Sequence, residues 1–266
     1  MRPCLIDGIL PTKAIHLLGG SPGAGKTRFS FGLLEQWLSG KAFLGHASSP
    51  VPYCFISLDR PRASVEETLE TMGLRDVVTQ LVCLNELPKE RSFKAVMETA
   101  CNKYPDSKLI CCEGFQLFAG DFINRYRPVA DLLTQSSSWC EAKDKTILGV
   151  CHASKTKEGA KFTKGRDRIG GTVAWSAYSE TIIIVDADEE TKIRTIDIYP
   201  RNAPEEKHQM MMTAGGVLVP CPKEKGDQLF IHILAIREGD HFERRWLLEL
   251  AENSGIGDKT ADRAIK

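Results

Sequence analysis

The chain has 266 residues, 42% of them hydrophobic, which is enough to bury a sizeable core in one large domain. Lys plus Arg and Asp plus Glu both number 35, so no overall positive field attracts nucleic acid, and any such binding must come from a local basic patch. The amino terminus carries no apolar signal segment and the apolar runs are far too short to span a bilayer, so we expect a cytoplasmic protein without a membrane contact.

Strand and helix patterns alternate along the first two thirds of the chain. A short apolar run at 14–18 ends in glycines, and residues 27–38 then carry helical periodicity, which predicts a strand, a glycine loop and a helix. This alternation continues and predicts an α/β fold, with a mostly parallel central sheet flanked by helices on both faces. Further strands are expected at 52–58, 81–84, 108–112, 146–151, 181–185 and 194–198, and further helices at 63–72, 93–103 and 129–143.

The pattern changes after Ser176, where strand candidates follow one another through short connections. Strands at 217–219 and 228–234 predict antiparallel additions at one edge of the sheet. We expect residues 1–240 to form one domain. Residues 241–266 have the pattern of a helix, a glycine turn and a helix, which fits either a partial helix-turn-helix or a C-terminal helical hairpin packed on the core.

The segment from Gly20 to Thr27 carries the clearest chemistry in the chain. It matches G-x-x-x-x-G-K-[ST] in full, follows an expected strand and precedes an expected helix, which is the context that makes this motif specific. Backbone amides of such a loop surround a triphosphate, the Lys26 ammonium meets its β and γ oxygens, and the Thr27 hydroxyl ligates Mg²⁺. We therefore predict that ATP and Mg²⁺ bind here, to Gly20, Ser21, Pro22, Gly23, Ala24, Gly25, Lys26, Thr27 and Arg28.

Two carboxylates follow apolar strand candidates and are expected to complete the catalytic site. Glu113 ends the strand at 108–112, where a carboxylate can reach Mg²⁺ through water. Asp59 comes just after the strand at 52–58 and is the candidate for activating the attacking water. Each residue also has an ordinary explanation, because acids commonly occur on the surface at strand ends and in turns.

A local basic patch follows the strand at 146–151. A glycine-rich, cationic loop that leaves a strand end near the phosphates suits contact with a nucleic-acid backbone, although a solvated loop has the same composition. His152, at the strand end, is a candidate relay between the γ-phosphate and this loop, and a satisfied polar residue is the alternative. The basic residues of the loop are Lys155, Lys157, Lys161, Lys164, Arg166 and Arg168.

Together these elements resemble the RecA-type ATPases, most closely the RepA-like replicative helicases and their phage relatives, and more distantly the DnaB-type ring helicases. The resemblance covers about residues 8–240. It implies a catalytic role for Asp59, and the stretch Val150-Cys151-His152-Ala153-Ser154-Lys155 implies a phosphate-sensor role for His152 and a DNA-facing role for the loop that follows.

The segment Tyr199-Pro200-Arg201-Asn202-Ala203-Pro204 is similar to the K-x-R-x-G-P stretch with which ring helicases insert a finger into the neighbouring subunit's site. Arg201 falls on the finger position. A guanidinium delivered by a neighbour stabilises charge on the transferring phosphoryl group, so the resemblance implies a homo-oligomer, a hexameric ring, acting on single-stranded DNA.

Four residues depart from the family pattern: Glu113 replaces Asp, Asp59 replaces Glu, Tyr199 replaces Lys and Ala203 replaces Gly. One methylene moves a carboxylate by about an ångström, so slow turnover is compatible with these departures. Three functions remain open at this point. They are an ATP-driven, helicase-like motor in DNA replication, a non-motor RecA-type switch or recombination or replication mediator, and a P-loop small-molecule kinase with the two loop arginines as its lid.

Overall fold

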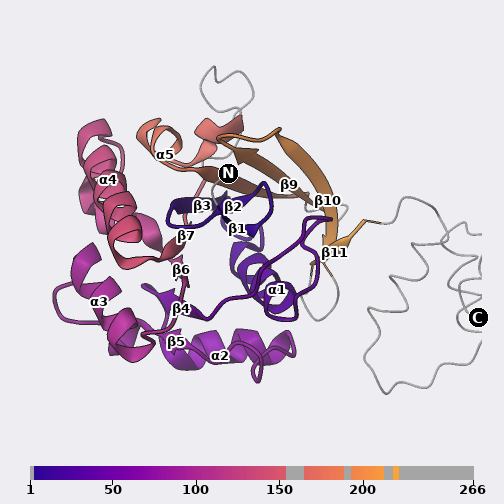
Figure 1. Ribbon diagram of the computed structural model, residues 1–266, viewed down its shortest axis with the longest axis horizontal. Helices are drawn as coiled ribbons and strands as arrows, with labels where there is room; N and C mark the ends of the chain where they lie inside the picture. The colour runs from indigo at the N-terminus through magenta and orange to yellow at the C-terminus, as the bar shows by residue number, and fades with distance from the viewer. Residues whose placement is uncertain (1–2, 154–164, 189–192, 213–217, 222–266) are drawn as a thin grey trace, which may run out of the picture.

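A mixed β-sheet runs through the centre of the protein. The computed structural model describes residues 3–153, 165–188, 193–212 and 218–221 (Figure 1). The strands in these ranges are β1 (Cys4–Ile6), β2 (Leu10–Pro11), β3 (Ile15–Gly20), β4 (Tyr53–Ser57), β5 (Leu81–Val82), β6 (Leu109–Glu113), β7 (Thr146–Val150), β8 (Thr181–Ala187), β9 (Ile193–Pro200), β10 (Glu206–Met212) and β11 (Leu218–Pro220). The described part of the sheet has nine strands in the order β11-β10-β9-β8-β3-β7-β6-β4-β5, and β1 and β2 form a separate pair.

The sheet is parallel over most of its width. The strands from β8 to β5 in that order run parallel, and β9, β10 and β11 continue the sheet antiparallel at one edge. The carboxyl ends of parallel strands all lie on the same side of the sheet, and ligands bind at this carboxyl-terminal side in open α/β sheets. The predicted α/β class is confirmed, and so are the antiparallel additions.

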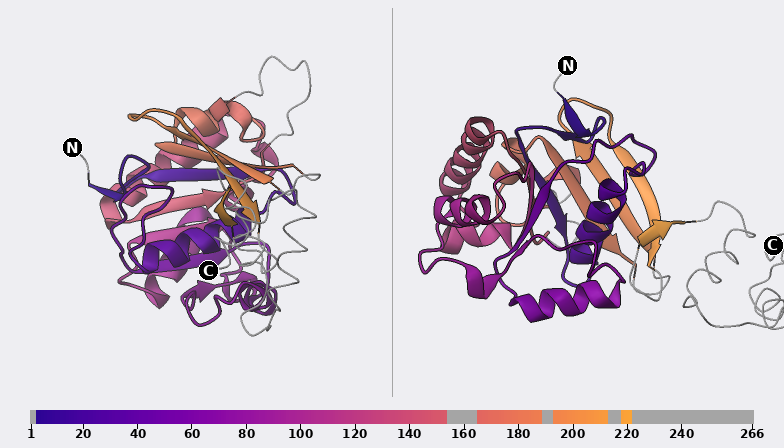
Figure 2. Two further views of the ribbon diagram at one scale, coloured as in Figure 1. Left: turned by 90° about the vertical axis from the view of Figure 1, so that its right-hand side faces the viewer. Right: turned by 60° about the horizontal axis from the view of Figure 1, so that its bottom comes forward.

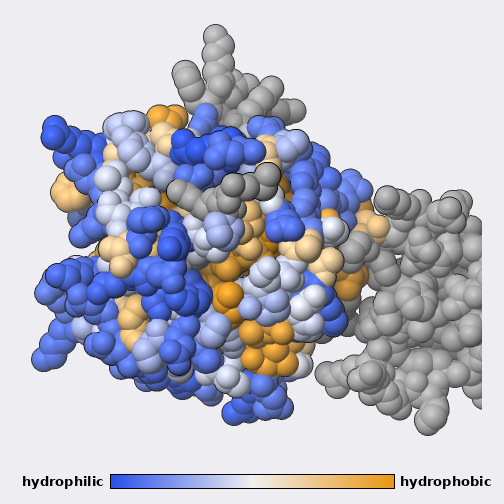
Figure 3. All heavy atoms as spheres, viewed as in Figure 1, coloured by the Kyte–Doolittle hydropathy of each residue, from blue (hydrophilic) through white to orange (hydrophobic). Residues whose placement is uncertain are grey.

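Helices cover both faces of the sheet. They are α1 (Lys26–Leu38), α2 (Arg62–Thr71), α3 (Phe93–Lys103), α4 (Tyr126–Lys143) and the short α5 (Ala174–Ala177), with 3₁₀ turns η1 (Leu84–Glu86), η2 (Phe115–Phe122) and η3 (Gly165–Arg168). Apolar residues of α1 and α2 pack on one face, and those of α3, α4 and α5 pack on the other. Figures 1 and 2 show α3 and α4 together on one side of the sheet and α1 on the opposite side. The face in Figure 3 is predominantly hydrophilic over α3 and α4, whereas the region around α1 is paler and includes hydrophobic patches.

Each central strand contributes to both cores because successive side chains of a strand point to opposite faces. Phe55 and Cys111 belong to the core under α1, whereas the neighbouring Ile56 and Cys112 belong to the core under α3 and α4. These strands are buried along their whole length, which explains why the sequence shows continuous apolar runs and no alternation. Burial raises the pKa of the Cys54 thiol to about 12, which fits a packing role.

The predicted elements agree with the observed ones to within a few residues over the first 200 positions. Within these positions the sequence patterns did not indicate the short elements β1, β2, α5, η1, η2 and η3, and beyond them they did not indicate β10. The strand expected at 228–234, the division at residue 240 and the helical segment at 241–266 lie outside the described residues. Within the described ranges, no helix is both long and apolar enough to cross a bilayer.

Gly149 of β7 packs directly against Phe115 of η2, and its replacement by alanine is expected to destabilise the protein. A Cβ at this position would lie 2.7 Å from Cγ of Phe115, a fully buried ring that packs over β7. The ring is held by its core neighbours, so we expect the free energy of unfolding to fall by about 2 kcal/mol. Chemical denaturation measures the change.

Gly32→Ala is the matched control for this prediction. Gly32 lies within α1, and a Cβ there would meet nothing within 4 Å. Alanine has the higher helix propensity, so this variant should be more stable by about 1 kcal/mol or less. Equal effects of the two substitutions would contradict the packing argument.

Candidate nucleotide-binding and catalytic site

The glycine loop predicted from the sequence connects the carboxyl end of β3 to the start of α1. Gly25 precedes the helix with φ of 93°, in the left-handed region that glycine adopts without strain, and the first helical hydrogen bond runs from the Phe29 amide to the Gly25 carbonyl at 2.8 Å. The amides of the first turn of a helix have no intrahelical acceptor and give that end its positive character. The loop and the helix end therefore form an anion-binding site.

Lys26 extends across the loop that precedes it. Its Nζ donates hydrogen bonds to the carbonyl oxygens of Gly20, at 2.9 Å, and Ser21, at 3.0 Å. An ammonium group has three donors, so one remains for a phosphate oxygen. Burial lowers the pKa of Lys26, and the nearby Cys151 and Glu113 oppose this shift. Lys26 is thus held by the loop with its charge close to where phosphates bind.

The carboxylate of Glu113 is the centre of a hydrogen-bond network. Glu113 ends β6, is only 7% exposed and lies beside Ser57 at the end of β4. Its Oε1 accepts from the hydroxyl of Thr27, while its Oε2 accepts from Ser57 Oγ at 2.7 Å and from Arg60 Nε at 3.0 Å. The two oxygens therefore have different partners: Oε1 contacts Thr27 at the end of the glycine loop, and Oε2 contacts Ser57 at the end of β4 and Arg60 just after it.

The candidate catalytic residues from three strands meet in one cavity, which we call the inner pocket. It has a volume of about 280 Å³ and is lined by Pro22, Gly23, Lys26, Thr27, Asp59, Glu113, Gly114, Gln116, Val150, Cys151 and His152. Asp59 reaches it from the segment just after β4, and its Oδ1 lies 3.3 Å from Ser57 Oγ. The structure therefore brings Lys26, Thr27, Asp59, Glu113 and His152 together, as the sequence predicts, because neighbouring parallel strands end at the same edge.

His152 lies at the open side of the inner pocket. Burial and the charge of Lys26 lower the pKa of His152, and Asp59 opposes the shift, so the imidazole is neutral at pH 7. Its backbone N–H donates to the side-chain oxygen of Gln116 at 2.6 Å. Sequence reasoning missed Gln116; the signal was a single amide within the apolar run 115–119 just after Glu113. The adjacent Cys151 is buried and its pKa is raised to about 12, which argues against a nucleophilic role.

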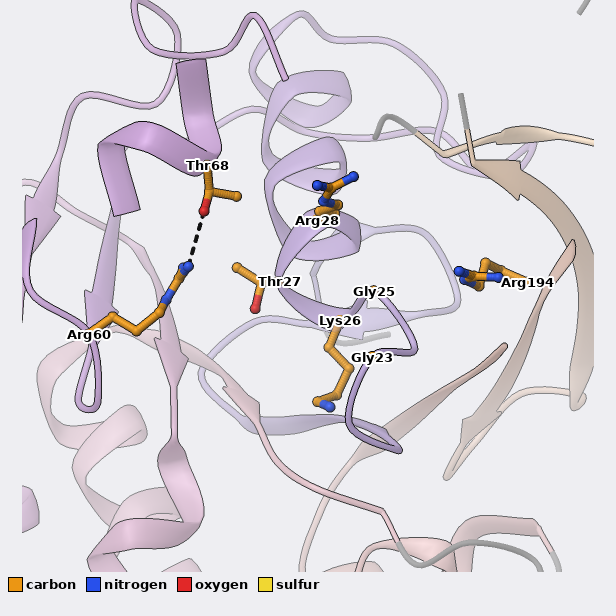
Figure 4. A pocket seen from close by; sticks show the side chains of 8 residues that line it. All are labelled: Gly23, Gly25, Lys26, Thr27, Arg28, Arg60, Thr68 and Arg194. Carbon is orange, nitrogen blue, oxygen red and sulfur yellow. Dashed lines mark hydrogen bonds between the residues drawn. The ribbon is translucent and has the colours of Figure 1, made fainter. Parts of the chain in front are cut away.

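A second cavity, the outer pocket, opens on the other side of Lys26 and Thr27. It has a volume of about 420 Å³ and is lined by Gly23, Gly25, Lys26, Thr27, Arg28, Arg60, Thr68 and Arg194. Figure 4 shows Arg60 and Thr68 on one wall and Arg194 on the opposite wall, with Lys26 and Thr27 between them. The ionisable residues of this lining are all basic, so the pocket suits the anionic phosphates of a nucleotide.

Sequence reasoning missed Arg60, Thr68 and Arg194. Arg60 directly follows Asp59, and a second charged residue after the strand could have indicated it. Arg194 gave no signal, because it reaches the pocket only through the antiparallel pairing of β9 with β8, where it lies opposite Ala187. Its long-range position could not be read from its neighbours in the chain.

The predicted nucleic-acid residues are only partly described. Lys155, Lys157, Lys161 and Lys164 lie outside the described residues. Arg166 is half-buried, and its Nη2 donates to the carbonyl of Ser179 at 3.2 Å.

Arg168 is 6% exposed, and its guanidinium binds both carboxylate oxygens of Asp186, with Nη2 to Oδ1 at 2.6 Å. This argues against a contact between Arg168 and a nucleic-acid backbone, because its donors face Asp186.

The base of the basic loop is joined to the nucleotide site. Ala153 pairs with Ile169 across the loop, and the Gly170 amide donates to the carbonyl of His152 at 3.1 Å. On the other side, the Ala153 amide donates to the carbonyl of Gly20 at 3.0 Å. One end of the loop is thus bonded to the strand that carries the glycine loop, and the other end is bonded to the first.

Arg201 lies at the opposite end of the sheet from the glycine loop. It follows Pro200, which pairs with Thr181 at the start of β8, whereas the glycine loop follows the end of β3 near Val185. Its Nη2 donates to the carbonyls of Ala177, at 2.6 Å, and Ser179. Arg201 lines neither the inner nor the outer pocket.

The residues of the inner pocket fit a nucleotide-bound Mg²⁺. The Thr27 hydroxyl donates a hydrogen bond to Glu113, so the lone pairs of its oxygen remain available to a metal ion. The Glu113 carboxylate could hold a water molecule bound to the same ion. In the described ranges, no group of three or more His, Cys, Asp or Glu residues could hold a metal alone.

A glycine loop at the end of a central parallel strand, with carboxylates on two neighbouring strands, defines a P-loop ATPase with a RecA-like fold. A family model described as an AAA domain matches residues 2–158, and the chain belongs to this family. Among solved structures, the chain is similar to the "ATPase Domain of G40P", with a TM-score of 0.59 and 12% sequence identity, over 79% of this chain and 85% of that chain. No curated protein sequence matches.

Proposed function

We propose that this P-loop ATPase is a homo-oligomeric, hexameric motor that uses ATP to act on single-stranded DNA, as a helicase in DNA replication. The position of Arg201 carries the proposal. Within one subunit the inner pocket contains Lys26, Thr27, Asp59, Glu113 and His152, but no arginine. Arg201 lines neither pocket of the same subunit, so in this proposal it serves the site of a neighbouring subunit.

The cis residues have distinct roles in this proposal. When bound, Mg²⁺ neutralises charge on the phosphates. Lys26 would bind the β and γ oxygens of ATP, and Thr27 and Glu113 would hold the metal ion, Glu113 through a water molecule. Asp59 would accept a proton from the attacking water. The guanidinium of Arg201 from a neighbouring subunit then stabilises the charge that develops on the transferring phosphoryl group. Hydrolysis therefore depends on the assembly of the subunits.

The connection between His152 and the basic loop supports coupling to DNA. His152 faces the inner pocket, and its own carbonyl and the neighbouring Ala153 hold the two ends of the loop. A neutral imidazole can donate one hydrogen bond to the γ-phosphate and lose it on hydrolysis. Such a change would move the base of the loop, and with it any strand that the lysines contact.

Arg201→Ala is the variant that tests this proposal. We expect it to bind ATP as the wild type does, but to lose the stimulation of phosphate release by single-stranded DNA and to hydrolyse ATP about 1,000-fold more slowly in the assembled state. Phosphate release and solution mass are measured with and without ATP and a single-stranded oligonucleotide.

Arg75→Ala is the matched control, because Arg75 is an exposed arginine that pairs with Glu70 away from both pockets. It should behave as the wild type. Phosphate release that is indifferent to DNA in the wild type, together with an unchanged rate in Arg201→Ala, would exclude the motor. Oligomerisation with little strand displacement would indicate the non-motor switch, and phosphate transfer to a small acceptor would indicate a kinase.

A further inference from the structure

Arg60 lies at the boundary between the two pockets. It contacts the carboxylate of Glu113, which lines the inner pocket, and it lines the outer pocket itself. Its Nε donates to Oε2 of Glu113 at 3.0 Å, and its Nη1 donates to the hydroxyl of Thr68 on α2 at 3.1 Å. Its side chain is 25% exposed and lines the outer pocket, as Figure 4 shows. The third arm of the guanidinium, Nη2, is buried and has no partner among the described residues.

The backbone holds Arg60 in this place from both sides. Its amide donates to Ser57 Oγ at 3.3 Å, and its carbonyl accepts from the amide of Leu84 at 3.0 Å. Ser57 itself donates to the same Glu113 oxygen that Arg60 contacts. The orientation of the Glu113 carboxylate therefore does not depend on Arg60 alone, whereas the positive charge beside its Oε2 comes from Arg60.

This arrangement gives Arg60 opposite effects on the two ligands of the site. A fixed cation in the outer pocket attracts the phosphates of a nucleotide. The same cation neutralises part of the charge on Glu113, the carboxylate that faces the metal through Thr27, so it weakens the attraction of the site for Mg²⁺. Arginine is suited to both tasks because it is always protonated and its donors point in several directions.

We propose that Arg60 is a positioning residue that acts as a resident cation: it shares Glu113 with Mg²⁺ and makes nucleotide binding less dependent on the metal. This inference rests on Mg²⁺–ATP binding at the glycine loop, which is part of the proposed function, but not on DNA or on assembly. The Glu113 carboxylate and the Arg60 guanidinium form an ion pair. In this pair Arg60 weakens the attraction of Glu113 for Mg²⁺, and Glu113 weakens the attraction of Arg60 for the phosphates.

The experiment compares ATP affinity with Mg²⁺ and with EDTA by calorimetry. For Arg60→Gln we expect the dissociation constant in EDTA to rise about tenfold, because the metal-free nucleotide loses one cation. With Mg²⁺ it should change by less than about threefold, because the freed Glu113 binds the metal more strongly. The enhancement of affinity by Mg²⁺ therefore increases. Arg60→Lys, which keeps the charge, should stay close to the wild type.

Arg62→Gln is the matched control, since Arg62 is two residues away but pairs with Glu86 and Glu66 outside both pockets. It should leave both dissociation constants unchanged. If Arg60→Gln folds poorly, as judged by its unfolding temperature, Glu113→Gln serves as the second variant. It removes the shared negative charge, so the enhancement by Mg²⁺ should fall, and affinity in EDTA should rise because Arg60 is then free to attract the phosphates.

The outcomes separate the inference from the proposed function. An equal loss of affinity in EDTA and in Mg²⁺ for Arg60→Gln would show a simple phosphate contact and overturn the inference. An unchanged enhancement by Mg²⁺ in Glu113→Gln would overturn it as well. A wild-type protein that binds no ATP in either buffer would instead overturn the proposed function.

Discussion

Lys26→Ala is expected to reduce ATP hydrolysis by about 1,000-fold, the largest effect of any single substitution in the glycine loop. Lys26 is the only lysine that lines the described inner pocket, and two of its donors are already bound to the loop carbonyls of Gly20 and Ser21. Its removal takes away a fixed charge beside the β and γ oxygens and also two bonds that hold the loop in place. We therefore expect weaker ATP binding together with the slower reaction.

Phosphate release and ATP binding by calorimetry measure the two effects of Lys26→Ala. Lys41→Ala is the matched control, because Lys41 pairs with Glu35 on the surface just beyond the far end of α1. It should keep the affinity and the rate of the wild type. Retention of wild-type hydrolysis in Lys26→Ala would place the reaction at another site and would contradict the assignment of the glycine loop.

Glu113→Gln is expected to reduce the rate of hydrolysis by about 100-fold while ATP is still bound. Glutamine has nearly the same shape, but its amide has one accepting oxygen, so it can keep the hydrogen bond from Thr27 or the one from Ser57 but not both, and it brings no negative charge to the metal side. The loss should therefore fall on kcat and much less on KM, because ATP is also held by the glycine loop and the outer pocket. Steady-state phosphate release over a range of ATP concentrations, with Mg²⁺ in excess, gives both constants.

Glu113→Asp distinguishes a geometric role from a purely electrostatic one. Aspartate keeps the charge but is shorter by one methylene, so it cannot reach Thr27 and Arg60 together from the end of β6 in the way that glutamate does. An intermediate rate is expected. A fully active Glu113→Asp would show that the long side chain is not needed, and an inactive one would show that the length of glutamate is matched to this site.

The order of the strands was not readable from the sequence. Strand candidates at 52–58, 108–112 and 146–151 are apolar throughout, and a continuous apolar run gives no register and no neighbour. The structure places β4 beside β6 and β6 beside β7, with Ser57 opposite Glu113. Only this pairing explains why the two carboxylate positions, which are 54 residues apart in the chain, meet at one pocket.

The basic loop shows where composition was misleading. Six cations between 153 and 171 suggested one nucleic-acid surface, yet Arg168 is buried against Asp186 of β8 and Arg166 is turned toward the carbonyls of Ser176 and Ser179. A charged residue in a loop is usually solvated, so the sequence favoured exposure for both arginines. Their partners come from later in the chain, and such pairs are decided by packing.

The sequence by itself determined the glycine loop, the alternation of strands and helices, and the carboxylates at the strand ends, because these depend on local spacing and on apolar patterning. The tertiary structure alone decided that Arg60 binds Glu113, that Arg194 faces the outer pocket and that Arg201 lies at the opposite end of the sheet. The reason is physical: a phosphate loop is made by consecutive backbone amides, whereas a pocket wall is made by side chains that only the pairing and direction of distant strands bring together.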